Sequence, residues 1–369
     1  MPALSAMPAR SYCGSANAVW QWRGCDVRYT AAHNNDNDVA VVLVHGLFVN
    51  ADHWRKTFPF LAEQGFAVYA LDMLGSGYSS KPRPDDQDAR RRVAGAVEDE
   101  IVEVEGLGSS SGAVRKGCVA VPQRHPLDSP FNFYTWAEQV VDFCDDVVLA
   151  ETGASKVALV CNSIGCITGL LAATKRPDVI RGVQCIAPNF RELHVAENPK
   201  FAQPATACVQ RLLRETALGS FAFSKLANPR AVAQILKEPY YDPANVDDDL
   251  VDALLTPLLL PNASAIVFDA LSYSAGPLPE QLLQHPAFVD HDIPVWVSLG
   301  TEDPWTPKPR ILALDRFPAV TNIDLLPACG HCPHDERPDL VNPLVLDFLR
   351  AVFQGGGNND DGGRRGGRS

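Results

Sequence analysis

Hydrophobic and polar positions along the chain follow two patterns, continuous apolar runs and longer stretches with helical spacing. The apolar runs predict strands at AVWQWRG and CDVRYTAA, and then over 39–47, 67–75, 156–163, 180–188, 294–300 and 321–328. Amphipathic patterns after several of these runs predict helices at ADHWRKTFPFLAEQG, TWAEQVVDFCDDVVLAETG, IGCITGLLAATKRP and PDLVNPLVLDFLRAVF. Such alternation predicts an α/β fold with a mostly parallel sheet covered by helices on both faces.

Helix-end signals accompany one of these patterns. Thr135 followed by Glu138 matches a capping box at the start of the second helix, and Gly153 is expected to end it.

Two stretches interrupt the alternation, and both ends of the chain are polar. Residues 81–129 contain charge runs and a GLGSSSG segment, which predict a disordered surface insertion. Residues 190–290 have helical patterns without strands and predict a lid over one end of the sheet. Residues 1–17 are expected to be flexible, and the Gly/Arg tail at 354–369 disordered. The remaining chain, 18–353, is predicted to form one domain.

Composition narrows the class of protein. The 369 residues carry 32 basic and 44 acidic side chains, a formal net charge of −12, which argues against a nucleic-acid surface. No apolar run is long enough to span a bilayer. The ten cysteines have no regular spacing and no signal peptide precedes them, so reduced, buried thiols are expected rather than disulfides. The sequence does not indicate an oligomeric state.

Candidate chemistry begins with the string Cys161-Asn162-Ser163-Ile164-Gly165, where a predicted strand runs directly into a helix. A serine on such a sharp turn is raised above the sheet edge as a nucleophile, and the amide of Ile164 at the helix start faces a developing oxyanion. The usual pattern is Gly-x-Ser-x-Gly, and Cys161 replaces its first glycine. The alternative is an ordinary serine at a helix N-cap.

Other strand ends supply the remaining parts of a serine-hydrolase site. His45-Gly46 follows an earlier strand, where the backbone amide of Leu47, or next that of Phe48, is expected to complete the oxyanion hole. The predicted strand over 294–300 leads to Asp303, with Glu302 as the neighbouring alternative. The last predicted strand leads to His331. The chain order serine, aspartate, histidine is the order of an α/β-hydrolase triad.

Acid–base chemistry assigns a role to each predicted triad residue. His331 takes the proton of Ser163 as the hydroxyl attacks, and Asp303 holds the imidazole in the required tautomer. Glu302 is the weaker candidate because its side chain should lie on the opposite side of an extended segment. No cofactor fingerprint occurs in the sequence, so none is expected.

The segment around His331 also resembles a metal cluster. The run His331-Cys332-Pro333-His334-Asp335-Glu336 carries five side chains of metal-ligating types. However, one short loop rarely reaches tetrahedral geometry, so no metal site is expected, and Asp335 is expected to cap the final helix.

Apolar residues elsewhere leave two explanations open. His53 and Trp54 are predicted to pack against a helix rather than to act in catalysis. Residues 254–260, Phe201, Phe221 and Phe223 are expected either to form the core of the lid or to line a tunnel for a long apolar substrate.

The strings HGLFVNADHWRK, YALDMLGSGYSSKP, YTWAEQVVDFC, CNSIG, GTEDPWTP and GHCPHDERPDLVNPLV together resemble chloroplast-type α/β-hydrolases of plants, algae and cyanobacteria. This group includes the pheophytinases and chlorophyll dephytylases. The resemblance covers about residues 18–353 outside the 81–129 insertion. It implies an α/β-hydrolase fold, a chloroplast location with peripheral thylakoid contact, and a serine hydrolase that cleaves a carboxylic ester. The implied substrate is a hydrophobic small-molecule ester, such as the phytyl ester of chlorophyll or pheophytin.

Three functional hypotheses follow from the sequence. The first is an esterase acting on a large hydrophobic ester. The second is a hydrolase of the C–C bond of a vinylogous diketone, because such enzymes share the Asn-Ser-x-Gly turn. The third is a ligand-binding receptor that keeps a vestigial triad. Without the resemblance, the expected location is the cytoplasm.

Overall fold

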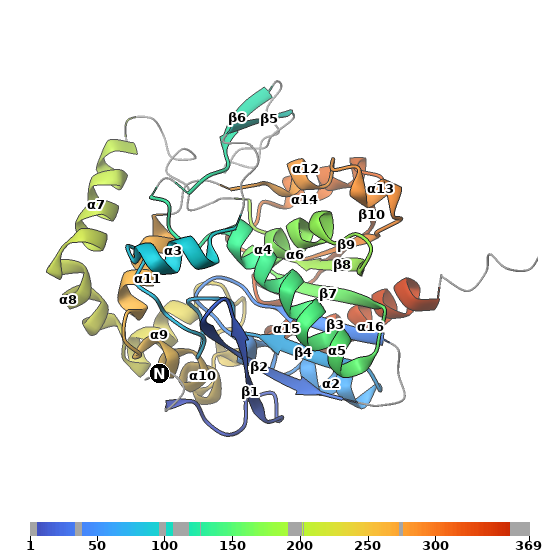
Figure 1. The fold of residues 1–369 in the computed structure, drawn as a ribbon, viewed down its shortest axis with the longest axis horizontal. Coiled ribbons are helices and arrows are strands. Elements are labelled where there is room, and N and C mark those ends of the chain that lie inside the picture. Colours follow the sequence, from blue (N-terminus) through green and yellow to red (C-terminus); the bar gives the residue numbers. More distant parts are fainter. Residues whose placement is uncertain are drawn as a thin grey trace, which may run out of the picture.

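The computed structural model describes residues 6–33, 39–95, 101–105, 118–125, 127–190, 201, 203–272 and 276–354. Its centre is an eight-stranded sheet of order β1-β2-β4-β3-β7-β8-β9-β10 (Figure 1). These strands are β1 (Asn17–Trp22), β2 (Cys25–Ala32), β3 (Val39–Val44), β4 (Ala67–Leu71), β7 (Lys156–Asn162), β8 (Ile180–Ile186), β9 (Val295–Gly300) and β10 (Val320–Leu326). In this sheet β2 pairs antiparallel with both β1 and β4, and the other neighbouring strands, in the order β4-β3-β7-β8-β9-β10, are parallel.

Alternate side chains of the central strands enter two separate hydrophobic cores. In β3, Val42 and Val44 belong to the core under α4 (Phe133–Phe143) and α6 (Ile164–Lys175). Val41 and Leu43 belong to the core under α2 (Phe58–Glu63) and α16 (Pro338–Gln354). Because both faces are buried, the strands read as continuous apolar runs. The predicted mostly parallel sheet, covered on both faces, is confirmed.

Between β8 and β9, the described residues form helices and contain no strand. These are α7 (Gln203–Glu215), α8 (Ala217–Leu226), α9 (Pro229–Leu236), a 3-10 turn (Pro243–Asn245), α10 (Asp248–Leu258), α11 (Ala263–Leu271), α12 (Pro279–Leu282) and α13 (Ala287–Asp290). In Figure 1, α7 and α8 lie at the outer edge of the molecule, away from the sheet. Short helices elsewhere include η1 (Ala51–Trp54), α3 (Gln87–Val93), α14 (Lys308–Leu312) and α15 (Pro333–Glu336).

Two local predictions are wrong. Helix α4 begins at Phe133 rather than at the predicted capping box, because the side chain of Asn132 accepts a hydrogen bond from the amide of Thr135. The 81–129 stretch is not without structure, since it contains α3, capped by Asp86, and the paired strands β5 (Ile101–Glu105) and β6 (Cys118–Pro122). β-branched residues recur in the sequences of β5 and β6 and favour strands, but the neighbouring charge runs led to a prediction of disorder. Residues 96–100, 106–117 and 126 lie outside the described residues.

The N-terminal segment is also better ordered than predicted. Cys13 is buried in the core under α2, and the hydroxyls of Ser11 and Thr30 are hydrogen-bonded at 3.2 Å. The expectation of flexibility over 1–17 is therefore wrong for residues 6–17, because these residues pack onto β2 and η1. The tail after Gln354 lies outside the described residues.

Two further sequence expectations concern thiols and membrane spans. In the described residues, nine of the ten cysteines are free thiols, and eight of these nine are buried. Among the same residues, no single helix is long and apolar enough to cross a bilayer, although the bent pair α10 and α11 passes that test when taken together.

Candidate active site

Ser163 lies in a sharp turn between β7 and α6. Its backbone has φ 55° and ψ −120°, which non-glycine residues rarely adopt. A serine that only caps a helix has an extended backbone and accepts a hydrogen bond from the first turn, whereas Ser163 makes no such bond. This geometry disagrees with an ordinary N-cap and agrees with a turn that raises a nucleophile above the sheet edge.

Small residues allow α6 to approach the sheet at this turn. A Cβ atom on Gly165 would lie only 2.5 Å from the carbonyl oxygen of Val44 and 2.6 Å from that of His45. Cys161 replaces the first glycine of the usual motif, and its sulfur lies against Gly169, where a Cβ atom would come within 2.5 Å of it. The larger residue in the strand is therefore accommodated by a glycine in the facing helix.

His331, on the loop after β10, is paired with Asp303, on the loop after β9. Nδ1 of His331 donates a hydrogen bond to Oδ2 of Asp303 at 2.8 Å. The other carboxylate oxygen accepts hydrogen bonds from the amides of Trp305 and Thr306 at 2.8 and 2.9 Å. Burial alone would raise the pKa of Asp303, but the hydrogen bond and charge of His331, with the two amides, lower it. Glu302, the sequence alternative, is exposed.

The second ring nitrogen of His331 is available within the cavity. Nε2 is buried and has no hydrogen-bond partner in the described part of the chain. Ser163 and His331 border the same cavity. An aspartate-oriented imidazole and a serine on a raised turn are therefore brought to one place, as the sequence predicts for a general base and its nucleophile.

The backbone around His331 is fixed by three contacts that sequence reasoning missed. The amide of His331 donates to the carbonyl oxygen of Pro239 at 2.7 Å, and the side-chain amide of Asn162 donates to the carbonyl oxygen of His331 at 3.3 Å. Oε2 of Glu336 accepts from the amide of Gly330 at 2.7 Å. Only the Asn162 contact had a sequence signal, because that residue directly precedes the predicted nucleophile.

The loop after β3 carries the other predicted oxyanion donors. Nδ1 of His45 donates to the carbonyl oxygen of Gly46 at 2.7 Å, and its Nε2 accepts from the amide of Met73 at 3.0 Å. Burial lowers the pKa of His45, so the ring is neutral, which this pattern of one donor and one acceptor requires. Leu47 and Phe48 follow, and both border the cavity with Ser163 and Ile164. Phe48 has φ 60°, a second strained residue at this edge.

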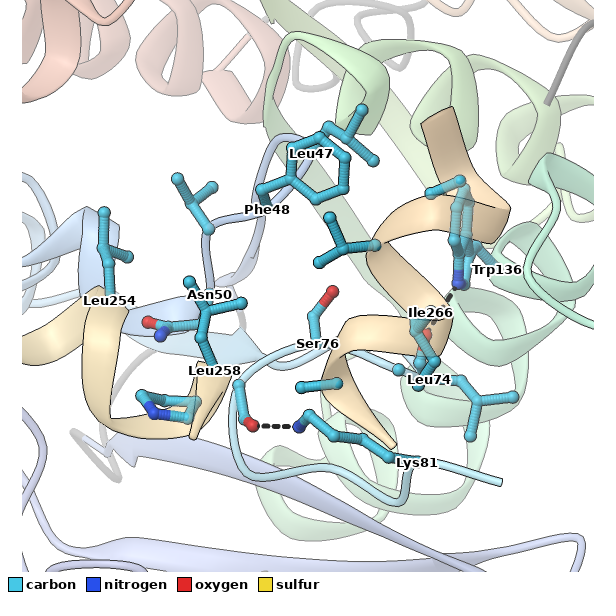
Figure 2. A pocket seen from close by; sticks show the side chains of 17 residues that line it. Leu47, Phe48, Asn50, Leu74, Ser76, Lys81, Trp136, Leu254, Leu258 and Ile266 are labelled. Carbon is cyan, nitrogen blue, oxygen red and sulfur yellow. Dashed lines mark hydrogen bonds between the residues drawn. The ribbon is translucent and has the colours of Figure 1, made fainter. Parts of the chain in front are cut away.

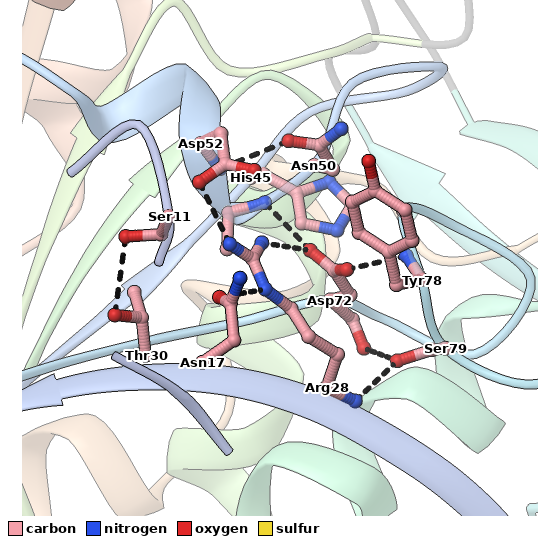
Figure 3. Close-up of polar contacts among 12 residues, drawn as sticks. Ser11, Asn17, Arg28, Thr30, His45, Asn50, Asp52, Asp72, Tyr78 and Ser79 are labelled. Atoms are coloured by element: carbon pink, nitrogen blue, oxygen red, sulfur yellow. Dashed lines mark hydrogen bonds and ion pairs between the residues drawn. The ribbon is translucent and has the colours of Figure 1, made fainter. Parts of the chain in front are cut away.

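A buried ionic cluster lies below this loop (Figure 3). The guanidinium of Arg28 contacts Asp52 at 2.7 Å and Asp72 at 3.1 Å, and all three side chains are almost inaccessible. Asp72 also accepts hydrogen bonds from the amides of Ala51 and Tyr78. The cluster thereby ties the segment after the oxyanion loop to β2 and to the segment after β4. Removing one partner would leave a buried, unpaired charge.

A chain of buried polar side chains connects the oxyanion loop, the inserted helices and the His331 loop. Nε2 of His334 contacts Nδ1 of His53 at 3.3 Å, and Nε2 of His53 contacts the hydroxyl of Tyr240 at 3.0 Å. Tyr240 donates to Oδ2 of Asp335 at 3.0 Å, and Arg55 donates to the same carboxylate. Since Tyr240 donates to Asp335, the ring of His53 must donate to Tyr240 and accept from His334.

This chain changes two sequence expectations. His53 does pack in the core, as predicted, but it also borders the cavity, and burial lowers its pKa to about 4, so it stays neutral. Asp335 does not cap the final helix, because it lies inside α15 and its carboxylate is buried against Arg55 and Tyr240.

The cavity beside Ser163 encloses about 330 Å³, near the lower end of the usual range for ligand pockets. Most of its wall is apolar, from Leu47, Phe48 and Val49 on the oxyanion loop to Ile235, Leu236 and Pro239 in and after α9, with Trp305 and Cys332. Polar groups come from the predicted triad region, His53, Tyr240, Asn162, Asn189 and Glu238. The described lining includes neither lysine nor arginine.

A smaller cavity of about 40 Å³ also borders the oxyanion loop (Figure 2). It shares Leu47, Phe48 and Val49 with the larger cavity, and its other apolar walls come from α10 and α11, with Leu74 and Trp136. Lys81 borders it and donates to the carbonyl oxygens of Gly77 and Ser79, and burial lowers the pKa of Lys81 to about 8.

The smaller cavity tests the two explanations for the apolar residues of the inserted segment. Leu254, Pro257 and Leu258 border it, but Leu254 and Leu255 are buried in hydrophobic clusters, which agrees with the lid-core explanation for part of 254–260. Phe223 packs edge-on against Phe268, as lid core would. For Phe201 and Phe221 both predictions are wrong, because both side chains are exposed.

The run from His331 to Glu336 does not converge on a common point. His331 faces Asp303, His334 faces His53, Asp335 faces Arg55, and Glu336 accepts from Gly330. Among the described residues, no group of three or more ligating side chains could hold a metal ion.

Comparison with known proteins defines the class to which this fold and site belong. Residues 41–344 match the model of the alpha/beta hydrolase family, and the chain belongs to that family. It is thus an enzyme of the hydrolase class, which acts on ester or related bonds.

A particular relative is the chloroplastic pheophytinase of Arabidopsis thaliana, which is 24% identical over 365 residues. That alignment covers 96% of this chain and 69% of the relative. Among solved structures, the fold is similar to 2-hydroxy-6-oxo-6-phenylhexa-2,4-dienoate hydrolase from Rhodococcus sp. RHA1, with a TM-score of 0.57, 20% identity and coverage of 91% and 100%. It is also similar to a bacterial membrane phospholipase A, with a TM-score of 0.55, 18% identity and coverage of 92% and 87%.

Proposed function

We propose that this protein is a serine hydrolase that cleaves the carboxylic ester of a large hydrophobic substrate, with Ser163 as nucleophile, His331 as general base and Asp303 as the residue that orients the base. The observation that carries the proposal is the 2.8 Å contact of His331 with Asp303, beside a cavity shared with Ser163. The unpartnered Nε2 of His331 and the strained Ser163 backbone support it further.

The proposed reaction has two steps. Oγ of Ser163 attacks the ester carbonyl carbon and gives its proton to Nε2 of His331, and the amides of Ile164 and of Leu47 or Phe48 stabilise the oxyanion. The tetrahedral intermediate releases the alcohol, which takes the proton from His331, and leaves an acyl-enzyme. Water then attacks the acyl carbon and gives a proton to His331; the bond to Oγ of Ser163 breaks, His331 returns the proton to Oγ, and the acid is released. The ionised Asp303 stabilises the imidazolium in both steps.

The substrate class follows from the cavity wall and from the relative. An apolar wall with few polar groups favours a hydrophobic ester over a charged one. A volume of about 330 Å³ admits an ester with part of an alkyl or prenyl chain, so a bulky ring system would remain at the mouth. Similarity to a pheophytinase supports the phytyl ester of chlorophyll or pheophytin as the substrate and a chloroplast as the location.

The C–C hydrolase hypothesis fits this cavity less well. The substrate in the name of the Rhodococcus hydrolase is a carboxylate. The described wall of the cavity offers no lysine or arginine to such an anion and contributes the carboxylate of Glu238. A buried anion without a cationic partner is costly, so we favour the ester.

The test is a substrate panel with the wild-type protein and Ser163→Ala. The panel contains pheophytin a, chlorophyll a, p-nitrophenyl esters of graded chain length and a dienoate-type vinylogous diketone. We expect release of pheophorbide or chlorophyllide and of p-nitrophenol by the wild type, without turnover by Ser163→Ala.

Each other outcome contradicts a defined part of the proposal. Cleavage of short acyl esters alone would exclude the pigment ester as the substrate. Cleavage of the diketone alone would show that the protein is a C–C hydrolase. Tight binding of the esters with at most one covalent event per protein would favour the receptor.

A further inference from the structure

Helices α7 and α8 expose apolar side chains that the packing of the protein does not require. Val209 and Leu212 on α7, with Leu218, Phe221 and Leu226 on α8, all lie on the surface. Phe221 is 59% exposed, and Phe201, just before α7, is 88% exposed. Scattered single apolar residues are normal on surfaces, but a set on two adjoining helices marks an interaction surface.

Both helices pack against α11 through residues other than these exposed apolar side chains. On α7, the side-chain amide of Gln210 donates to the carbonyl oxygen of Leu271 on α11 at 2.8 Å. On α8, Phe223 already provides the apolar anchor against Phe268. Val209, Leu212 and Phe221 remain outside, while other residues of the same two helices make these inner contacts.

The charge of the same segment is opposite to that of the chain. Helices α7 to α9, residues 203–236, carry four basic side chains and one acidic, in a protein whose net charge is −12. Arg211, Lys225 and Arg230 are exposed between the apolar residues, and the ammonium of Lys225 lies 5.3 Å from the ring centre of Phe221. Alternating apolar and basic side chains on an exposed helix are typical of segments that lie in the interface of an anionic membrane.

We propose that the outer face of α7 and α8 docks the enzyme onto an anionic lipid surface, with Val209, Leu212, Leu218, Phe221 and Leu226 entering the headgroup boundary. The basic residues bind the lipid phosphates and the apolar residues bury their side chains. The adjoining helix α9 carries Ile235, which is exposed and also borders the cavity beside Ser163. The link to a lipid-dissolved ester rests on the proposed function, whereas docking itself does not.

The test measures binding to vesicles independently of hydrolysis. Co-sedimentation is measured with phosphatidylcholine vesicles and with vesicles that contain phosphatidylglycerol, at low and high salt. The variants are the apolar set Leu212→Ser/Leu218→Ser/Phe221→Ser and the charge set Lys225→Glu/Arg230→Glu. The matched control is Val289→Ser/Leu312→Ser, since both residues are similarly exposed but lie on α13 and α14, away from α7 and α8 (Figure 1).

We expect the wild type and the control to bind anionic vesicles and to bind less at high salt, because the charge attraction is screened. Each patch variant should lose at least tenfold in binding, while hydrolysis of a water-soluble p-nitrophenyl ester stays at the wild-type rate. Equal binding of wild type and patch variants would overturn the proposal. So would self-association through the patch without vesicle binding, which would identify a protein interface. Inactivity of the wild type towards every ester would contradict the proposed function and leave the vesicle result to decide docking.

Discussion

The loops at the carboxyl end of the sheet and the outer helices α7 and α8 use their side chains in opposite ways. Around Ser163 and His331, polar groups are buried and paired across long sequence distances, and backbones approach so closely that only glycine fits. On α7 and α8, large apolar groups face solvent. The first arrangement fixes chemical groups in place, and the second leaves a surface free for an external partner. Substitutions should therefore have large effects at the sheet end and small effects on these helices.

The largest effect is expected for the residue that orients His331. Asp303→Asn should lower kcat for a p-nitrophenyl ester about 10⁴-fold, or about 5 kcal/mol, because an amide favours the wrong tautomer of the imidazole. The exposed neighbour gives the control, since Glu302→Gln should change kcat by less than about threefold. Similar losses in both variants would show that the acidic partner of His331 has been misassigned.

A second prediction concerns the close approach of α6 to β3. Gly165→Ala places a methyl group 2.5 Å from the carbonyl oxygen of Val44, so it should lower the free energy of unfolding by about 3 kcal/mol. Gly153→Ala is the control for the loss of glycine's conformational freedom without a close contact, because Gly153 has φ 71° and open space around it. This variant should lower the free energy of unfolding by about 1 kcal/mol. Denaturant unfolding of both variants measures the difference, and equal losses would argue against a tight contact.

A third prediction is a pH dependence of stability that arises from His53, in the buried polar chain at the sheet end. The pKa of His53 is lowered by burial from 6.5 to about 4, so the unfolded chain binds more protons between these values. Its contribution is complete above pH 6.5 and falls by about 1.4 kcal/mol per pH unit as the pH drops towards 4.

The variant His53→Gln isolates this contribution from those of other groups. The slope of unfolding free energy against pH between 6.5 and 4.5 should be smaller in the variant than in the wild type. Leu212→Ser and Leu218→Ser neither add nor remove a titratable group, so both should leave the slope unchanged. Parallel slopes for the wild type and His53→Gln would show that His53 is not held neutral in the fold.

The smallest effect is expected on the outer helices. Leu212→Ser and Leu218→Ser should each change the free energy of unfolding by less than about 0.5 kcal/mol, because both residues are surface positions outside the hydrophobic cores. Thermal or denaturant unfolding checks this value. A loss above about 2 kcal/mol in either variant would mean that this face is part of the core.

The sequence predicts well what is local to strand ends. The sheet follows from continuous apolar runs, and Ser163, Asp303 and His331 each follow a predicted strand within a few residues, so chain order was sufficient to group them. The helix start at Phe133 and the β5–β6 pair were missed because capping and charge signals in neighbouring residues competed with the correct pattern.

Contacts between distant segments could not be predicted in the same way. Tyr240 and Asp335 are 95 residues apart, and Arg28 meets Asp72 across 44 residues. A buried hydrogen bond of this kind leaves no periodicity in either segment, and each residue type is common on surfaces. The outward position of Val209 and Leu212 was hidden for a related reason, since an amphipathic pattern does not tell which face meets the protein.

The central claim is that Ser163 is an activated nucleophile. Labelling of the intact protein with a fluorophosphonate, followed by peptide mass spectrometry, tests it most directly, with Ser163→Ala and Asp303→Asn as comparison variants. We expect one adduct per chain, located on Ser163, absent in Ser163→Ala and formed far more slowly in Asp303→Asn. An unlabelled wild-type protein, or an adduct on another residue that persists in Ser163→Ala, would contradict it.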